Sequence, residues 1–237
     1  YDVVIAGAGI AGSHLASMIN PRYNVLILEQ NRKVIPKDSG IVSTRFDSIF
    51  GGSAKKLVKF RISRMECVSP SGHTFSLQSD EPYAYILRRK MFGRSLRKNA
   101  KKNADISYET VESVKFAENC AVVKTKDGEY KTKIVVGCDG TNSVVRRAMN
   151  IENPKVALGI MVKTRQKMEG DISVFFNKYF SPDFFSWIIP QNNEYGIMTC
   201  VRPKDYFDYF VKNTYLPPGK MYAYMIPYTY TKSYDNN

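Results

Sequence analysis

Near its amino terminus the chain reads "VVIAGAGIAG" from Val3 to Gly12. Four apolar residues lead into three glycines spaced as G-x-G-x-x-G, a pattern typical of a buried strand that turns tightly into a helix. The neighbouring sequence predicts three elements in order: a strand over Asp2–Ala6, a helix over Ile10–Ile19 and a second strand over Tyr23–Leu28. An asparagine–proline pair directly after the helix favours its end at this point.

The glycine turn predicts a dinucleotide site. Gly7 permits the tight turn, Gly9 lets a pyrophosphate approach the backbone, and Gly12 lets the helix pack against the sheet. Ala11 lies in the first turn of this helix, whose free N–H groups and positive dipole end attract phosphate. The alternative is a glycine-rich turn without a ligand. The flanking strands and helix favour the nucleotide, because they supply the context that the motif requires.

An acid closes the second strand: Glu29 lies 22 residues after Gly7. It can accept hydrogen bonds from both hydroxyls of a ribose, and we include its neighbour Gln30 in the predicted site. Because a carboxylate repels a 2′-phosphate, the predicted nucleotide is NAD or FAD rather than NADP. The predicted fold class is therefore α/β, with a Rossmann-like nucleotide-binding domain.

Three later stretches indicate which dinucleotide binds. Residues 88–104, "RRKMFGRSLRKNAKKNA", predict a helix with many bases outside. Residues 106–116 alternate like a strand, and residues 133–149 predict a buried strand that ends in "GCDG". The residues expected on the inner face of the helix are Met91, Leu96 and Ala100.

Together with the glycine turn, these stretches resemble the FAD proteins of the para-hydroxybenzoate hydroxylase type, which share an R-x-x-F helix start and a later G-x-D-G-x-x-S-x-x-R. The resemblance implies that Arg89, which begins R-K-M-F, helps to hold the FAD. It also implies that Asp139 and Gly140 lie near the ribose and pyrophosphate, and that the backbone at Val111 meets the adenine. The family usually has Asp where this chain has Gly93. A solvated basic helix face and an ordinary Asp-Gly turn are the alternatives for these motifs.

The remaining sequence predicts a second, sheet-rich domain. Residues 56–78 are typical of two or three short strands with a turn at Ser69–Gly72, and alternating strands dominate from Ile151 onward. We expect a largely antiparallel sheet, built from two pieces of chain, over which a substrate lies. The predicted domains are a discontinuous FAD-binding domain over 1–55 and 84–150, and a substrate-binding domain over 56–83 and 151–237.

One stretch in this second domain is more specific. The sequence "PDFFSWIIP" resembles the P-x-x-Y-x-W-x-F-P motif of geranylgeranyl reductases, a branch of the same FAD group. Pro182, Trp187 and Pro190 match, whereas Phe185 stands for Tyr and Ile189 for Phe. The resemblance implies that these residues line a cavity for an isoprenoid chain, which needs apolar walls because it has nothing to hydrogen-bond. A core strand with Trp187 as packing is the alternative.

Two further features bear on the resemblance. Ser39 and Gly40 lie in a loop that runs beside the flavin in family members, often with a Cys that this chain lacks. The family also carries a later G-D motif and a helical tail, and no GD(A/G) follows Ser143 here. We therefore expect an amino-terminal portion of a longer polypeptide.

Composition restricts partners and compartment. Lys and Arg number 35 against 22 Asp and Glu, so the net charge is +13 and an anionic partner is favoured. The bases are spread without an RNA-binding motif, so no nucleic acid is expected. No apolar run reaches the ~20 residues of a membrane span, and four scattered cysteines with only two histidines predict a cytoplasmic protein without a metal site.

The resemblance implies an FAD-dependent reductase that saturates C=C bonds of geranylgeranyl chains in isoprenoid lipids, as in archaeal membrane-lipid synthesis. The positive charge suits a phosphate-bearing lipid or peripheral contact with an anionic membrane. The electron donor, NAD(P)H or ferredoxin, stays open, and no catalytic proton donor is nominated. The alternatives are an aromatic-ring monooxygenase of the same fold group and a non-catalytic binding module.

Overall fold

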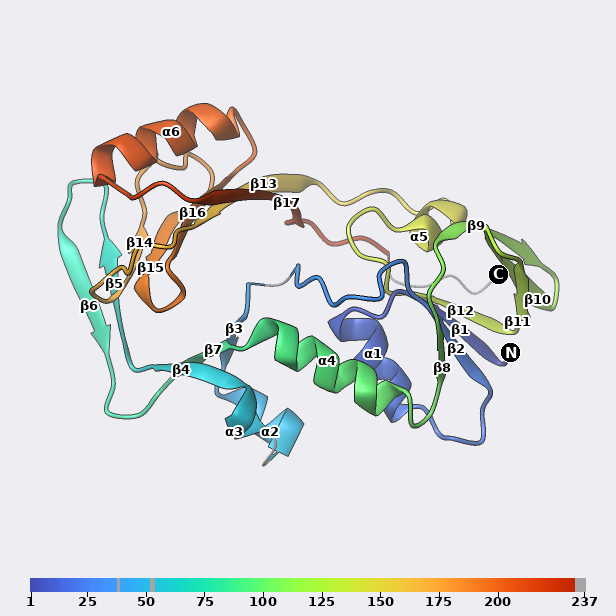
Figure 1. Ribbon diagram of the computed structural model, residues 1–237. Helices are drawn as coiled ribbons and strands as arrows, with labels where there is room; N and C mark the ends of the chain where they lie inside the picture. Colours follow the sequence, from blue (N-terminus) through green and yellow to red (C-terminus); the bar gives the residue numbers. More distant parts are fainter. Residues whose placement is uncertain (38, 52–53, 233–237) are drawn as a thin grey trace. The chain divides into compact units, whose positions relative to one another are not determined.

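A computed structural model describes residues 1–37, 39–51 and 54–232 (Figure 1). The chain forms two compact units, each assembled from separate stretches. The first comprises Tyr1–Asp38, Arg88–Pro154 and Tyr230–Asn237, and the second comprises Ser39–Leu87 and Lys155–Thr229. The assignment of FAD binding to 1–55 and 84–150, and of substrate binding to 56–83 and 151–237, stays a prediction.

A four-stranded parallel sheet forms the centre of the first unit, with the strand order β12-β1-β2-β8. Helix α1 follows β1 and leads into β2, so the predicted strand–helix–strand unit is confirmed. Every residue of β1 and β2 is buried, as the apolar runs require. The bounds are β1 Val3–Ala6, α1 Ile10–Met18, β2 Val25–Leu28, β8 Asp105–Ser107 and β12 Ile134–Gly137.

Alternating side chains of β1 divide the unit into three layers. Val3 and Ile5 pack on the face covered by α1 and α4 (Arg89–Ala100). Val4 and Ala6 pack on the other face, with residues of a three-stranded antiparallel sheet and of α5. These elements are β9 Val111–Ala117, β10 Cys120–Thr125, β11 Glu129–Thr132 and α5 Val144–Ala148.

The prediction of one strand over residues 106–116 is wrong, because β8 and β9 belong to different sheets. The chain turns between them at Glu109, whose carboxylate accepts hydrogen bonds from the hydroxyls of Ser107, Thr125 and Tyr130 at 2.5, 2.5 and 2.6 Å. These bonds, that from Ser107 foremost, hold the pKa of Glu109 below its usual range. The ionised carboxylate therefore ties the turn to the neighbouring sheet.

Two expectations about burial are also wrong. Met91 is 46% exposed, because the buried stripe of α4 runs through Phe92, Leu96 and Ala100 at helical spacing. The strand β12 is partly exposed rather than buried, with Ile134 at 56%, because β12 lies at the edge of the sheet and pairs only with β1.

The second unit is built on a seven-stranded sheet with the order β17-β13-β16-β15-β14-β5-β6. All neighbours are antiparallel except β14 and β5, so the predicted largely antiparallel sheet from two pieces of chain is confirmed. The predicted turn after β5 is confirmed by the hydrogen bond from the Gly72 N–H to the Ser69 carbonyl. The bounds are β5 Arg64–Val68, β6 Thr74–Gln78, β13 Val156–Lys163, β14 Ile172–Phe175, β15 Ser186–Ile189, β16 Glu194–Thr199 and β17 Lys220–Pro227.

A helix that the sequence analysis missed, α6 (Pro203–Thr214), covers one face of this sheet. Its Phe207 and Phe210 pack with Ile160 and Ile197. Trp187 and Ile189 lie on the opposite face, where they pack with residues of a three-stranded sheet of order β3-β7-β4. The remaining elements are β3 Ile41–Ser43, α2 Arg45–Phe50, α3 Ala54–Leu57, β4 Val58–Ile62, β7 Ala84–Leu87 and the 3-10 helix η2 Pro190–Asn192.

In the sheet, Gly196 has no room for a side chain. A Cβ at this position would lie 2.6 Å from the Trp187 ring and would collide with the Ile160 carbonyl oxygen. We expect Gly196→Ala to lower the free energy of unfolding by ~1–3 kcal/mol, as overpacking does. Gly128→Ala is the control, because a Cβ there meets no atom of the described residues within 4 Å. Equal denaturant midpoints for the two variants would contradict this packing.

Candidate nucleotide-binding site

The three glycines of the turn have different surroundings. Gly7 has a φ of +100°, and a Cβ there would collide with the Cys138 carbonyl group. A Cβ at Gly12 would collide with the Gly7 carbonyl oxygen and lie 3.1 Å from the Cys138 Cβ. At Gly9, by contrast, a Cβ would meet no atom of the described chain within 4 Å. Two glycines are therefore needed for packing, and the third leaves open space.

That open space adjoins the N-terminus of α1, a helix of nine residues. Gly9, Ile10 and Ala11 are all exposed, and Gly9, the N-cap residue of α1, supplies no side-chain hydrogen bond to the first helical turn. The N–H groups of the first helical turn therefore face solvent with the positive end of the helix dipole behind them. This arrangement suits a phosphate.

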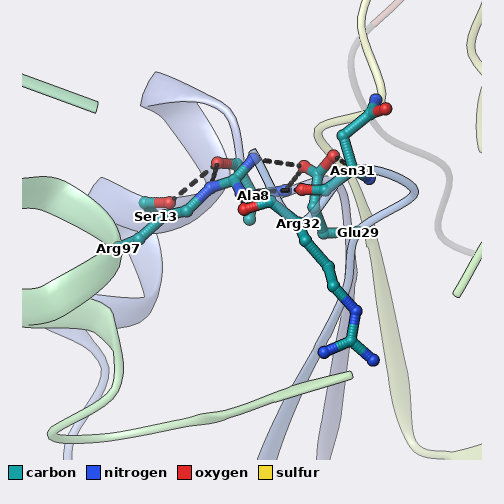
Figure 2. Close-up of polar contacts among 6 residues, drawn as sticks. All are labelled: Ala8, Ser13, Glu29, Asn31, Arg32 and Arg97. Atoms are coloured by element: carbon teal, nitrogen blue, oxygen red, sulfur yellow. Dashed lines mark hydrogen bonds and ion pairs between the residues drawn. The ribbon is translucent and has the colours of Figure 1, made fainter. Parts of the chain in front are cut away.

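Glu29 lies at the end of the adjacent strand and is 8% exposed (Figure 2). Its Oε2 accepts a hydrogen bond from the Ala8 N–H at 2.8 Å, and its Oε1 accepts one from the Asn31 N–H at 2.9 Å. The carboxylate also forms an ion pair with Arg97, with 3.2 Å between Nη2 and Oε2. Glu29 is thus fixed against the glycine turn by its own neighbours.

Arg97 of α4 is the residue of this site that sequence reasoning missed, because Arg97 was not among the residues expected on the inner face of the helix. Its Nε donates to the Ala8 carbonyl at 3.0 Å, and its Nη1 donates to the carbonyls of Asn31 and Arg32 at 2.8 and 3.2 Å (Figure 2). Position 97 lies three residues before Ala100, on the inward stripe of the helix. The three-residue spacing between Arg97 and Ala100 could have predicted that Arg97 faces inward.

Asp139 and Gly140 follow the strand on the other side of β1. The Asp139 Oδ2 accepts hydrogen bonds from the N–H groups of Val144 and Val145 at 2.6 and 3.4 Å. Its Oδ1 is buried and has no hydrogen-bond partner among the described residues. Gly140 has a φ of +84°, which favours glycine at this turn. One carboxylate oxygen thus holds α5 while the other is left unsatisfied.

Several of the sequence-predicted cofactor residues therefore meet at one edge of the parallel sheet, where β1, β2 and β12 end. Ligands of open α/β sheets bind at this carboxyl edge. The residues at this edge are Gly7, Gly9, Ala11, Gly12, Glu29, Gln30, Asp139 and Gly140. Arg89 begins α4 and Val111 begins β9, in the same unit.

The structure also explains a departure from the family pattern. Gly93 stands where the family has Asp, and a Cβ there would lie 2.6 Å from the Val34 Cγ1.

Cys138 beside the glycine turn is half-buried, and burial together with the Asp139 charge raises the pKa of its thiol. The thiol is therefore protonated at neutral pH and is a poor nucleophile.

The other predicted residues belong to the second unit. Gly40 has a φ of +74° and its carbonyl accepts from the Leu87 N–H, while the Ser39 hydroxyl bonds to the backbone of Ile41. Asp38 lies outside the described residues. In the predicted isoprenoid motif, Pro182 is exposed, Phe185 is 38% exposed and Trp187 is half-buried, whereas Ile189 and Pro190 are buried.

The parallel sheet, the open glycine turn and the separate antiparallel sheet define a Rossmann-like fold with a second, sheet-rich unit, which confirms the predicted fold class. Residues 2–218 match the family model described as lycopene cyclase protein. The chain belongs to this family.

Individual proteins similar to this chain indicate which members of the FAD-dependent oxidoreductases it resembles. The chain is 26% identical to a digeranylgeranylglycerophospholipid reductase of Methanoculleus marisnigri over 93% of this chain, and it spans 62% of that relative's length. It is 30% identical to an FAD-dependent monooxygenase of Emericella variicolor over 62% of this chain and 35% of the relative. A geranylgeranyl bacteriochlorophyll reductase-like structure from Thermoplasma acidophilum has a TM-score of 0.79 at 17% identity, over 96% of this chain and 66% of that one. The predicted resemblance to FAD-dependent oxidoreductases of the geranylgeranyl reductase type is confirmed.

Within residues 1–37, 39–51 and 54–232, no helix combines the length and apolar character needed to span a bilayer. The same residues contain no cluster of His, Cys, Asp or Glu that could hold a metal ion.

The glycine surroundings predict opposite effects for two substitutions. We expect Gly9→Ala to leave the thermal midpoint nearly unchanged, because its Cβ enters open space, and to weaken ADP binding by about tenfold or more, because it occupies the position where phosphate approaches. Gly12→Ala should instead destabilise the fold strongly, because its Cβ collides with backbone. Differential scanning fluorimetry and titration calorimetry with ADP measure both. Undiminished ADP affinity of Gly9→Ala would argue against the site.

Proposed function

We propose that this chain provides the FAD site and the substrate-binding sheet of an FAD-dependent reductase that saturates C=C bonds of geranylgeranyl chains in isoprenoid lipids. The observation that carries the proposal is the open space at Gly9, beside an exposed helix N-terminus and a fixed Glu29. The relatives named as digeranylgeranylglycerophospholipid reductases support the substrate class. The family name refers to lycopene, another apolar polyene.

The residues at the sheet edge fit FAD. The turn from Gly7 to Gly12 would hold the pyrophosphate, Glu29 with Gln30 the ribose, and Asp139 with Gly140 the adjoining phosphate and ribose. The unsatisfied Asp139 Oδ1 is a buried acceptor that a ligand or water would satisfy.

Four further residues complete the proposed FAD site on the resemblance alone: Arg89 for the cofactor, the Val111 backbone for the adenine, and Ser39 with Gly40 for the flavin side. Reduced FAD, when bound, supplies the hydride for alkene reduction. The protein contributes binding, orientation and exclusion of water. An NAD(P)H or ferredoxin donor that reduces the FAD is part of the same proposal.

The side chains on the Trp187 face of the seven-stranded sheet favour an apolar substrate. The strand register places Val174, Trp187, Gly196, Met161 and Tyr222 on this face, since each is directly opposite the next. Hydrocarbon chains gain most from burial against such aromatic and aliphatic side chains.

In the predicted isoprenoid motif, some residues would contact the prenyl chain and others would hold those residues in place. The ring of Phe185 meets Trp187 edge-on with 6.1 Å between centroids, and the Phe176 ring lies 6.4 Å from that of Phe185. We assign the contact with the prenyl chain to Phe185, Trp187 and Pro182, which solvent reaches in part. The buried Ile189 and Pro190 would position them.

An aromatic-ring monooxygenase is the second candidate, and the relative named as an FAD-dependent monooxygenase, at 30% identity, favours monooxygenase chemistry. Purification of the complete protein, an absorbance scan and lipid extraction distinguish the two. The reductase predicts a flavin band at about 450 nm, retained prenyl lipid and, after chemical reduction, transfer of two hydrogens to each double bond. A complete protein that contains no flavin would contradict both candidate functions. A flavoprotein that hydroxylates phenols with O₂ and leaves the prenyl lipid unchanged would support the monooxygenase.

The motif predicts a separation of lipid and flavin binding. We expect Phe185→Ala to weaken prenyl-lipid binding by about tenfold, since burying a phenyl ring contributes ~1.5–3 kcal/mol, while FAD affinity is unchanged. Phe116→Ala is the matched control, because Phe116 is an exposed phenyl of β9 in the first unit. Mass-spectrometric quantification of co-purified lipid measures the difference, and equal lipid content in both variants would count against the assigned contact.

Contact with an anionic membrane through α4 is a further part of the proposal. Residues 88–104 contain eight bases and no acid. Met91 is exposed on the same segment, and the exposed bases are Arg88, Lys90, Arg94, Lys98, Lys101 and Lys102. Bases near an anionic surface each contribute ~1 kcal/mol, and a nearby apolar side chain can insert among the headgroups.

We expect the protein to sediment with vesicles containing phosphatidylserine but not with pure phosphatidylcholine vesicles, and to be released by salt. Reversal of two charges, Arg94→Glu with Lys98→Glu, should lower this binding by about tenfold or more. Lys115→Glu with Lys124→Glu is the control, because these exposed bases lie on β9 and β10. An equal loss in both double variants would show a dependence on net charge alone.

A further inference from the structure

Arg97 differs from every other base around it. Of the eight bases in residues 88–104, all of which the structure describes, only Arg97 is buried, at 8% exposure. The cost of burying a guanidinium is large unless its N–H groups find acceptors. The hydrogen bonds and ion pair of Arg97 supply those acceptors, so its position is specific rather than incidental.

The guanidinium links two segments that carry the nucleotide site. Nε bonds the carbonyl of Ala8 in the glycine turn, and Nη1 bonds the carbonyls of Asn31 and Arg32 after β2 (Figure 2). Nη2 faces the Glu29 carboxylate at 3.2 Å. A lysine has a single nitrogen on a flexible stem and cannot serve these four acceptors from one plane.

The hydrogen bonds of Glu29 limit what it can offer to a ligand. An ionised carboxylate has about four acceptor positions, two on each oxygen. On Oε2, the Ala8 N–H takes one position, and the Arg97 guanidinium, with Nη2 3.2 Å away in an ion pair, blocks access to the other. On Oε1 the Asn31 N–H takes one position. One position on Oε1 is left.

We infer that Arg97 is a positioning residue that leaves Glu29 able to accept a hydrogen bond from only one of the two ribose hydroxyls. The inference rests on the proposed nucleotide site and is narrower than the sequence-based expectation that Glu29 accepts from both hydroxyls. The second hydroxyl then meets water or another group. Without Arg97, the second position on Oε2 becomes available and Glu29 can serve both hydroxyls.

Three probes test the inference in the full chain: ADP, 2′-deoxy-ADP and 3′-deoxy-ADP, each measured by competition with FAD through flavin fluorescence. A hydrogen bond to a charged acceptor contributes ~1.5–3 kcal/mol, so its loss weakens binding by about tenfold or more. The native protein should lose about tenfold with one deoxy analogue and about twofold or less with the other. Arg97→Gln should lose about tenfold with both.

Arg94→Gln is the matched control, because Arg94 is an exposed base of the same helix, and it should keep the native pattern. Equal losses with both analogues in the native protein would overturn the inference. So would an Arg97→Gln variant that weakens all three ligands by one common factor, since this is the result of a purely structural role. A folded native protein that binds no ADP would overturn the proposed nucleotide site itself, and the inference with it.

The losses of affinity that the native protein shows with the two deoxy analogues report how many acceptor positions of Glu29 are free, even if Arg97→Gln does not fold. In that case Arg97→Lys takes its place. The shorter reach of the lysine should free the Oε2 position and give losses with both analogues. Retention of the native ratio in a folded Arg97→Lys variant would contradict the role of the guanidinium fork.

Discussion

The site depends on the close approach of α1 to the ends of β1 and β12. Gly7 and Gly12 permit this approach, because a side chain at either position would collide with backbone. The contact fixes where α1 begins, and with it the exposed N–H groups beside Gly9. It also places the Ala8 N–H against Glu29 and the Ala8 carbonyl against Arg97. The open space, the carboxylate and the buried base are thus consequences of one packing constraint.

Several secondary-structure elements that depend on local sequence patterns were predicted correctly from the sequence. The first strand, the helix after it and the second strand follow from an apolar run, a glycine spacing and a second apolar run, and each is found within two residues of its predicted bounds. The turn at Ser69–Gly72 and the largely antiparallel strands of the second unit also follow from local patterns, although the strand ends were not predicted residue by residue. These features need no information from distant parts of the chain.

The features that were missed depend on tertiary contacts. Arg97 is buried because distant backbone carbonyls accept its hydrogen bonds, and composition alone made it one more surface base. Residues 106–116 alternate as one strand would, but Glu109 divides them between two sheets. Helix α6 offered a signal that went unused: Pro203 at its start, then Phe207 and Phe210 three residues apart.

In the proposed site, the ADP portion of the cofactor lies on the turn at Gly9, with its ribose at Glu29. A crystal structure of the protein soaked with ADP tests this position. We expect the diphosphate against the N–H groups at the start of α1 and a single ribose hydroxyl within hydrogen-bond distance of the Glu29 carboxylate. Density for ADP elsewhere on the molecule, with the turn at Gly9 bare, would contradict it.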